Sequence, residues 1–229
     1  MIDQQNQSEI VILSGGLDST VCMAIAYERT NTAPLALSFD YGQRHKIELE
    51  RAALVAKHYG SRHLVVPINM PWKGSSLTDM DIDVPITELS SSHEDNIPTT
   101  YVPARNIIFL SLALSLAEAS NAQGIYIGVN ALDYSGYPDC RPQFIDAFQK
   151  MANVGQARAI SGNPVKIHTP LINMTKAQII QRAISLKAPL EITWSCYQGL
   201  DQPCGKCESC QLRQKGFAQA GLADPSLAQ

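Results

Sequence analysis

The sequence lacks the features that would point to a membrane, to export or to nucleic acid. Its longest apolar stretch, from Ile107 to Ala117, is too short to span a bilayer and contains two serines. Its start, MIDQQNQSE, has neither the positive nor the apolar region of a signal peptide. Acidic residues outnumber basic ones, 21 against 18, so the net charge of −3 gives no sign of a nucleic-acid partner. We therefore expect a soluble cytoplasmic protein with no membrane and no nucleic-acid partner.

The chain also has no visible internal repeat and no clear linker. Its 229 residues fit one large α/β domain, or such a domain with a small appendage. With 45% hydrophobic residues it can bury a substantial core. We expect a main domain over residues 1–190 and a small C-terminal segment over residues 191–229 packed on it.

Apolar runs rich in β-formers alternate along the chain with runs of helical character. This alternation predicts βαβ units, hence an α/β fold with a doubly wound, mainly parallel five-stranded sheet. The segment from Pro71 to Pro98 breaks the alternation, and a loop of that length is usually a functional lid or disordered. Strands are expected over 10–13, 34–39, 63–68, 124–129 and 165–171, and helices over 19–29, 47–59, 105–121, 142–160, 175–186 and 207–220. Thr175 is the expected N-cap of the fifth helix.

A glycine-rich loop follows the first expected strand and reads Ser14-Gly15-Gly16-Leu17-Asp18-Ser19-Thr20. Two glycines let the backbone turn and bring amide groups close to an anion, while the helix N-terminus adds free N–H donors and a positive dipole end. The loop is not a Walker A sequence, because no Gly-Lys-Ser/Thr follows it. An ordinary strand-to-helix turn is the alternative, but the glycines and hydroxyls favour a phosphate-binding loop.

Four of the six cysteines crowd into the tail as Cys196, Cys204, Cys207 and Cys210. This spacing can close a tetrahedral Zn²⁺ site, and in a reducing compartment it favours a metal over disulfides. Four sulfurs leave no open coordination position, so the zinc would be structural and would pin the C-terminal helix against the sheet. A redox pair and an iron–sulfur cluster are the alternatives.

The glycine-rich loop resembles the pyrophosphate-binding loop of the N-type ATP pyrophosphatases. Further segments narrow the resemblance to the 7-cyano-7-deazaguanine synthase family of that superfamily, and it covers about Ile10 to Phe217. The family form Val-Pro-Gly-Arg-Asn appears here with Ala104 in place of the glycine. The other segments are Ser38-Phe-Asp-Tyr-Gly-Gln-Arg-His45, Gly128-Val-Asn-Ala-Leu-Asp-Tyr-Ser-Gly-Tyr-Pro-Asp-Cys-Arg141, Thr169-Pro-Leu-Ile-Asn-Met-Thr-Lys176 and Trp194-Ser-Cys-Tyr197.

This resemblance implies a ligase that forms C–N bonds in queuosine biosynthesis. It implies conversion of 7-carboxy-7-deazaguanine, ATP and ammonia to 7-cyano-7-deazaguanine through adenylated intermediates, with Mg²⁺ and Zn²⁺ as cofactors and a homodimer as the assembly. Because a nitrile requires removal of both carboxylate oxygens, we expect two ATP per product. No glutaminase domain is present, so the expected nitrogen donor is free ammonia.

The resemblance and the chemistry together assign candidate residues. Asp18, Arg105 and Lys176 are the expected catalytic residues, Asp18 either as an Mg²⁺ partner or in pairing with its helix dipole. His45 is a weaker candidate for deprotonating ammonium, and Cys140 is either a nucleophile or, more plausibly, a loop-packing residue. The nucleotide is assigned to Leu13, Ser14, Gly15, Gly16, Leu17, Asp18, Ser19, Thr20, Val21, Cys22, Met23 and Arg44. The deazapurine is assigned to Asp133, Tyr134, Tyr137, Asp139 and Arg141, although turn chemistry explains part of that segment equally well.

Two other functions compete with this interpretation. A tRNA-thiolating enzyme with the same loop requires a catalytic cysteine and usually a basic surface, and the acidic charge balance argues against it. A non-enzymatic zinc-knuckle module that binds nucleic acid is supported by the tail alone.

Overall fold

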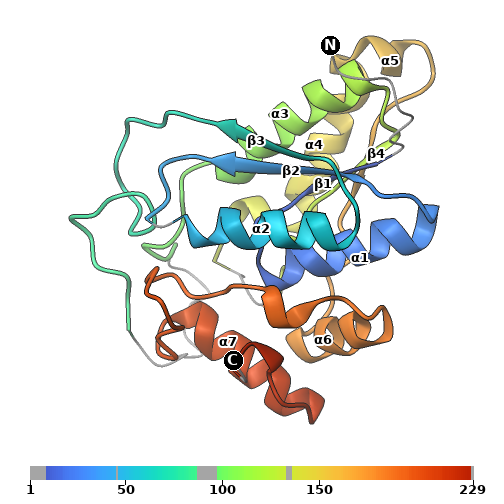
Figure 1. The fold of residues 1–229 in the computed structure, drawn as a ribbon. Helices are drawn as coiled ribbons and strands as arrows, with labels where there is room; N and C mark the ends of the chain where they lie inside the picture. The colour runs from blue at the N-terminus through green and yellow to red at the C-terminus, as the bar shows by residue number, and fades with distance from the viewer. Residues whose placement is uncertain (1–8, 45, 87–96, 133–135, 228–229) are drawn as a thin grey trace.

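The computed structural model describes residues 9–44, 46–86, 97–132 and 136–227. Its centre is a five-stranded sheet in the order β3-β2-β1-β4-β5, and each neighbouring pair is parallel (Figure 1). The strands are β1 Glu9–Ile12, β2 Leu35–Asp40, β3 His63–Pro67, β4 Gly124–Tyr126 and β5 Lys166–His168. The expected α/β class, the five strands and their parallel arrangement are therefore confirmed.

The central strand β1 is buried along its whole length. Ile10 pairs with Leu35 of β2 on one side and with Ile125 of β4 on the other. A strand covered on both faces reads as a continuous apolar run, as Ile10 to Ile12 does. The chain order reverses between β1 and β4, and open α/β sheets bind ligands beyond the carboxyl ends of the strands at such a point.

Helices cover both faces of the sheet, which confirms the doubly wound arrangement. One core cluster joins Ile10 to Leu110 and Phe148, and the other joins Val11 to Val21 and Ile179. Helices α3 Arg105–Ser120 and α4 Pro142–Gly155 supply the first cluster. Helices α1 Leu17–Thr30, α2 Ile47–His58 and α6 Lys176–Ser185 supply the second, and Thr175 caps α6 through a capping box with Gln178 as predicted.

Three elements differ from the expectation by several residues, and one of them is β5, which ends at His168 and not at the expected Leu171. The helix expected over 142–160 is divided into α4 and α5 Ala157–Ile160, because Gln156 has an extended backbone with φ −114° and ψ 143°. The Gln156 side chain is buried there and donates from Nε2 to the Leu114 carbonyl at 3.2 Å. Strand β4 ends at Tyr126, three residues short of its expected end at Val129, since the chain leaves the sheet toward the ligand-binding edge.

The C-terminal segment packs beside α6. It contains α7 Glu208–Ala220, with the short 3-10 helices η2 Leu190–Ile192 before it and η3 Pro225–Leu227 after it, while η1 Pro138–Cys140 precedes α4. The buried Arg213 of α7 donates to Asp224 from Nε at 2.6 Å and from Nη2 at 2.9 Å. Its Nη1 also donates to the Thr193 hydroxyl at 2.7 Å, so one guanidinium joins helix, loop and tail. The domain boundary after residue 190 stays a prediction.

The described part of the segment between Pro71 and Pro98 is fastened to the rest of the protein. The Arg44 guanidinium donates to the carbonyls of Ser76 at 3.1 Å, Asp79 at 3.1 Å and Ile82 at 2.6 Å. Ser75 and Ser76 are fully buried. Residues 71–86 are thus an ordered cover, and residues 87–96 lie outside the described part of the chain.

Candidate active site

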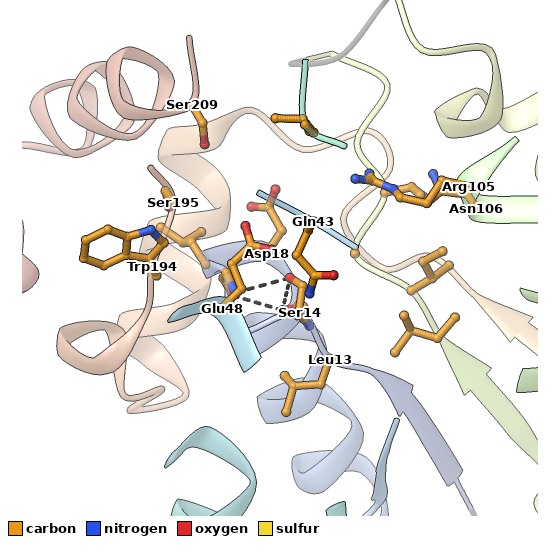
Figure 2. Close-up of a pocket in the computed structure, with 18 of the residues that line it drawn as sticks. Leu13, Ser14, Asp18, Gln43, Glu48, Arg105, Asn106, Trp194, Ser195 and Ser209 are labelled. Carbon is orange, nitrogen blue, oxygen red and sulfur yellow. Dashed lines mark hydrogen bonds between the residues drawn. The ribbon is translucent and has the colours of Figure 1, made fainter. Parts of the chain in front are cut away.

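A pocket lies beyond the carboxyl ends of the strands, as the topology predicts (Figure 2). The glycine-rich loop forms one wall, and the first turns of α2 and α3 supply Glu48, Arg105 and Asn106. The segment that precedes the cysteine cluster forms another wall with Trp194 and Ser195. At least six separate stretches of sequence therefore meet at one cavity, since Gly128 to Asn130 and Lys176 line it too.

Hydrogen bonds within the glycine-rich loop fix its shape. The Ser14 amide donates to the Ser19 hydroxyl at 3.2 Å, and the Gly16 amide donates to the Ser14 hydroxyl at 3.3 Å. Gly15 has φ +81°, and a Cβ there would come within 2.6 Å of the Ala52 amide nitrogen and closer still to the Glu48 carbonyl. Only glycine permits this approach of loop and helix. Ser14 is exposed to the pocket, so its hydroxyl and the neighbouring amide face a ligand there.

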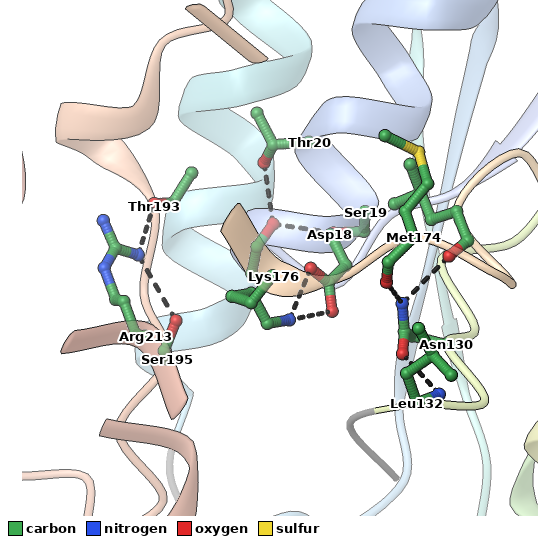
Figure 3. Close-up of polar contacts among 12 residues, drawn as sticks. Asp18, Ser19, Thr20, Asn130, Leu132, Met174, Lys176, Thr193, Ser195 and Arg213 are labelled. Atoms are coloured by element: carbon green, nitrogen blue, oxygen red, sulfur yellow. Dashed lines mark hydrogen bonds and ion pairs between the residues drawn. The ribbon is translucent and has the colours of Figure 1, made fainter. Parts of the chain in front are cut away.

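A buried ion pair joins the loop to α6. Lys176 Nζ donates to the two carboxylate oxygens of Asp18 at 2.8 and 2.9 Å (Figure 3). Asn130 steadies the approach to α6, because its Nδ2 donates to the carbonyls of Leu171 at 2.9 Å and Met174 at 2.6 Å. This pair was not foreseen: Asp18 was expected to serve an Mg²⁺ ion or the helix dipole. Both oxygens instead contact a cation of the protein, which holds that cation at the pocket.

Arg105 and Glu48 add one group of each charge to the pocket. Burial opposes the charge of Arg105, yet the neighbouring Tyr41 and Tyr137 hydroxyls raise the pKa of this guanidinium, so it stays a cation. Tyr41 accepts from Arg105 Nη1 at 3.5 Å. Burial raises the pKa of Glu48 to about 7, although the charge of Arg105 acts in the opposite direction.

The structure brings most of the predicted nucleotide residues to the pocket. Those that line it are Leu13, Ser14, Gly16, Leu17, Asp18, Ser19 and Arg44, and the predicted catalytic residues Arg105 and Lys176 line it too. Gly15 and Thr20 lie behind that surface, Thr20 donating to the Gly16 carbonyl at 2.9 Å. Val21, Cys22 and Met23 belong to the buried core, so their predicted contact with nucleotide gains no support from the geometry.

Arg44 lines the pocket, but its guanidinium is engaged by the three carbonyls of the cover segment. This favours a role in shaping the pocket over the phosphate contact that we predicted.

The predicted substrate residues separate into three groups. Tyr137 lines the pocket and lies within 2.6 Å of the Thr100 hydroxyl, and burial raises its pKa to about 12. Asp139 is buried and accepts a hydrogen bond from the Asn106 amide at 3.0 Å, so it stabilises the first turn of α3. Arg141 is exposed and lies outside the pocket lining. Asp133 and Tyr134 lie outside the described residues, as does His45.

Cys140 lines the pocket without the environment of a nucleophile. Its thiol is buried and accepts from Asn106 Nδ2 at 3.4 Å. Burial, with the charge of Asp139, raises its pKa to about 12. The thiol therefore stays protonated, which favours the packing role.

Sequence reasoning missed Glu48, Gln43, Trp194, Ser195 and Tyr197 as pocket residues. Glu48 is one polar position in an amphipathic helix, and no local signal distinguishes it from a solvated carboxylate. The Trp-Ser-Cys-Tyr segment had been noticed only for its resemblance to a family. Its position explains the motif: the Trp194 amide donates to the Gly15 carbonyl at 3.0 Å, and the indole donates to the Cys196 carbonyl at 2.9 Å.

The four tail cysteines meet at one point. Their sulfur atoms all lie within 4.8 Å of one another, as a single metal ion requires. Backbone amides aim at the sulfurs, with Gln198 and Cys204 donating to Cys196 at 3.4 and 3.3 Å. Two further amides, those of Lys206 and Cys207, donate to Cys204 at 3.4 and 3.3 Å. This donor set fits a closed thiolate site, and its first member, Cys196, directly follows Ser195 of the pocket wall.

In the parts of the chain that the structure describes, every helix is too short or too polar to cross a membrane.

Comparisons with known proteins agree with this geometry. The model of the family described as "Queuosine biosynthesis protein QueC" matches residues 8–221. A protein of Leptospira biflexa named 7-cyano-7-deazaguanine synthase is 52% identical over 235 residues, which cover 97% of this chain and 95% of that protein. One of the same name from Acetivibrio thermocellus is 54% identical over 217 residues, or 94% and 95% of the two chains.

Solved structures show the same fold. The NMN synthetase of Francisella tularensis superposes with a TM-score of 0.50 at 14% identity, covering 95% of this chain and 78% of that one. Because both the family model and relatives above 50% identity span nearly the entire sequence, this chain belongs to the QueC family of queuosine biosynthesis proteins.

Proposed function

We propose that this protein converts 7-carboxy-7-deazaguanine, ammonia and ATP to 7-cyano-7-deazaguanine, the product for which its relatives are named. The observation that carries the proposal is one pocket in which the loop of residues 14–19, the cation Lys176 and the cation Arg105 converge. Such an arrangement suits a polyphosphate and an anionic substrate that react with each other.

The first chemical step joins the substrate to AMP. A carboxylate is a poor electrophile, so its oxygen attacks the α-phosphorus of ATP, the bond from that phosphorus to the bridging oxygen breaks, and diphosphate leaves. The Gly16 amide and the hydroxyls of Ser14 and Ser19 hold the departing diphosphate. Lys176 neutralises its charge, held in place by Asp18. Mg²⁺ bound to the nucleotide would add further charge neutralisation.

The second half of the reaction introduces nitrogen. Ammonia adds to the acyl carbon, AMP leaves, and an amide remains. The amide oxygen is then adenylated by a second ATP, and loss of AMP with the N–H protons gives the nitrile. Arg105 lies at the side of the pocket opposite the loop, where its charge can hold the carboxylate of the incoming substrate.

The cysteine cluster contributes through structure. We propose that it binds Zn²⁺ through Cys196, Cys204, Cys207 and Cys210, and four thiolates leave the ion no open position for substrate. The ion would fasten the segment from Trp194 to Tyr197, which forms one wall of the pocket and contacts Gly15. A homodimer and a cytoplasmic location, both implied by the family resemblance, complete the proposal.

A single incubation tests the proposed activity. The protein is supplied with 7-carboxy-7-deazaguanine, ammonium, Mg²⁺ and ATP, and mass spectrometry follows the carboxylate, amide and nitrile. We expect the nitrile in the native protein and a decrease in turnover of about 10²- to 10³-fold in Lys176→Met, since one charge-stabilising group is lost. Lys150→Met, an exposed substitution on α4, is the matched control and should be unaffected. Absence of any nitrile with a folded, zinc-loaded protein would refute the proposal.

A further inference from the structure

Glu48 is an acidic side chain that the mechanism above leaves without a task. It belongs to the first turn of α2, and the backbone at this residue packs directly on Gly15 of the glycine-rich loop. Its side chain lines the same pocket as Asp18 and Arg105, and Figure 2 places it beside Ser14. A carboxylate at this point therefore lies in the same cavity as the glycine-rich loop and the two cations assigned to the reaction.

The two carboxylates at the loop differ in their partners. Asp18 accepts two hydrogen bonds from Lys176, whereas no hydrogen bond or ion pair engages Glu48 within the described residues. Glu48 is nevertheless half-buried, a costly position for an unsatisfied acid. A group kept unpaired at such a site is free to exchange a proton with a ligand.

The charged groups around Glu48 come from several elements. The charge of Arg105 on α3 favours the ionised form of Glu48, while burial opposes that form and raises the pKa of Glu48 to about 7. Tyr41 after β2 is close enough for the Glu48 charge to raise its pKa. The Lys176–Asp18 pair is nearly neutral as a unit, and Arg51 on the same helix lies over the Trp194 ring at 5.8 Å. Burial thus makes the Glu48 carboxylate a stronger base than an ordinary exposed glutamate.

We propose that Glu48 is the general base that accepts the proton from the attacking nitrogen. The inference rests on the proposed function, because it assigns a residue to the ammonia-dependent half of that reaction. As the ammonia nitrogen forms its bond to the acyl carbon, one N–H proton passes to the Glu48 carboxylate. The carbon–oxygen bond to AMP then breaks, and its electron pair leaves with AMP.

The same residue suits the elimination that forms the nitrile. After the amide oxygen is adenylated, a nitrogen proton passes to Glu48, the electron pair of the N–H bond completes the triple bond, and AMP departs with the oxygen. Two other ionisable groups in the described part of the site are less suited: Asp139 accepts from the Asn106 amide at 3.0 Å, and burial keeps the Cys140 thiol protonated.

The test separates adenylation from proton transfer. We compare Glu48→Gln with Glu50→Gln, a substitution at an exposed position two residues further along the same helix. Without ammonia, carboxylate-dependent exchange of labelled diphosphate into ATP measures formation of the acyl-adenylate. With ammonium, single-turnover mass spectrometry measures formation of the amide. With hydroxylamine, a nucleophile that is largely unprotonated at neutral pH, the same assay measures the hydroxamate.

For Glu48→Gln we expect diphosphate exchange within about threefold of the native rate and amide formation slowed by about 10²- to 10⁴-fold, the usual contribution of a general base. Hydroxamate formation should fall much less than amide formation, because the nitrogen of the hydroxylamine adduct is more acidic than that of the ammonia adduct and loses its proton to water with less help from a base. Glu50→Gln should match the native protein in all three assays.

Three results would overturn the inference. Loss of diphosphate exchange in Glu48→Gln would assign the residue to the nucleotide or its metal. Equal loss with both nucleophiles would indicate a structural role, and unchanged amide formation would exclude any role. Failure of the proposed function looks different, since the native protein itself would then give no amide and no nitrile.

Discussion

Gly216 offers a sharp test of how α7 supports the active site. This glycine lies on α7 where it crosses α6, and an added Cβ would come within 2.9 Å of Lys176 Cβ, 3.0 Å of Ile180 Cδ1 and closer still to Lys176 Cγ. Carbon atoms prefer to lie about 3.5–4.0 Å apart, so the chain must move. The obstacle is the stem of Lys176, whose far end is held by Asp18, and a held stem cannot swing away.

The size of the effect follows from two opposing terms. Replacing a helical glycine by alanine stabilises a helix by about 0.5–1 kcal/mol. Overpacking a buried contact costs about 1–3 kcal/mol. The Gly216→Ala variant should thus lose roughly 0.5–2 kcal/mol, which lowers the melting temperature by about 1–8 °C at this chain length. Displacement of Lys176 should also weaken ATP binding.

Gly155→Ala is the matched control. It is another helical glycine, the last residue of α4, where a Cβ meets Met151 Sδ at an ordinary 3.7 Å. We expect no loss of stability there and unchanged ATP binding. Differential scanning calorimetry and ATP titration compare the two variants. A melting temperature for Gly216→Ala equal to or above that of Gly155→Ala would refute the argument that α7 holds Lys176 in place.

Three further predictions concern a backbone position, the metal and pH. Ala104 has φ +55°, a conformation that costs a residue with a Cβ about 1–2 kcal/mol. Ala104→Gly should therefore raise the melting temperature slightly, although glycine increases the entropy of the unfolded chain. A decrease in the melting temperature would contradict this. Removal of zinc by a chelator should lower the melting temperature and abolish ATP binding, and added Zn²⁺ should restore both. If elemental analysis confirms that the protein is metal-free and it still binds ATP, the proposed role of the cluster is contradicted. Burial, with the charges of Arg29 and Lys166, lowers the pKa of His168 to about 4, so the unfolded chain takes up the proton first and stability falls as pH decreases from about 6.5 toward 4. Between pH 7 and pH 5, the free energy of unfolding measured with urea should fall by about 1 kcal/mol less in His168→Gln than in the native protein. An equal fall in the two proteins would contradict the assignment.

Local pattern was sufficient to predict the elements of the fold. The run before Ser14 predicts a strand because a strand buried on both faces is continuously apolar over a few residues. The run after Leu17 predicts a helix because its apolar residues recur at helical spacing. The break at Gln156 left none, since it depends on a hydrogen bond to Leu114 in another helix.

The site was only partly predictable, for the same physical reason. The loop amides and the cysteine cluster are local motifs, and the structure places each as a unit. The Lys176–Asp18 pair joins residues 158 positions apart, and Glu48 becomes a pocket residue only because α2 packs on Gly15. Arg44 is the converse case: its position suggested a phosphate contact, but the fold engages it with carbonyls of the cover segment.

Phosphorus NMR of the reaction mixture tests the central claim most directly, namely that the loop of residues 14–19 holds the outer phosphates of ATP and leaves the α-phosphorus open to attack. We predict that each nitrile formed is accompanied by two AMP and two diphosphate. Appearance of ADP and orthophosphate in their place would contradict the account.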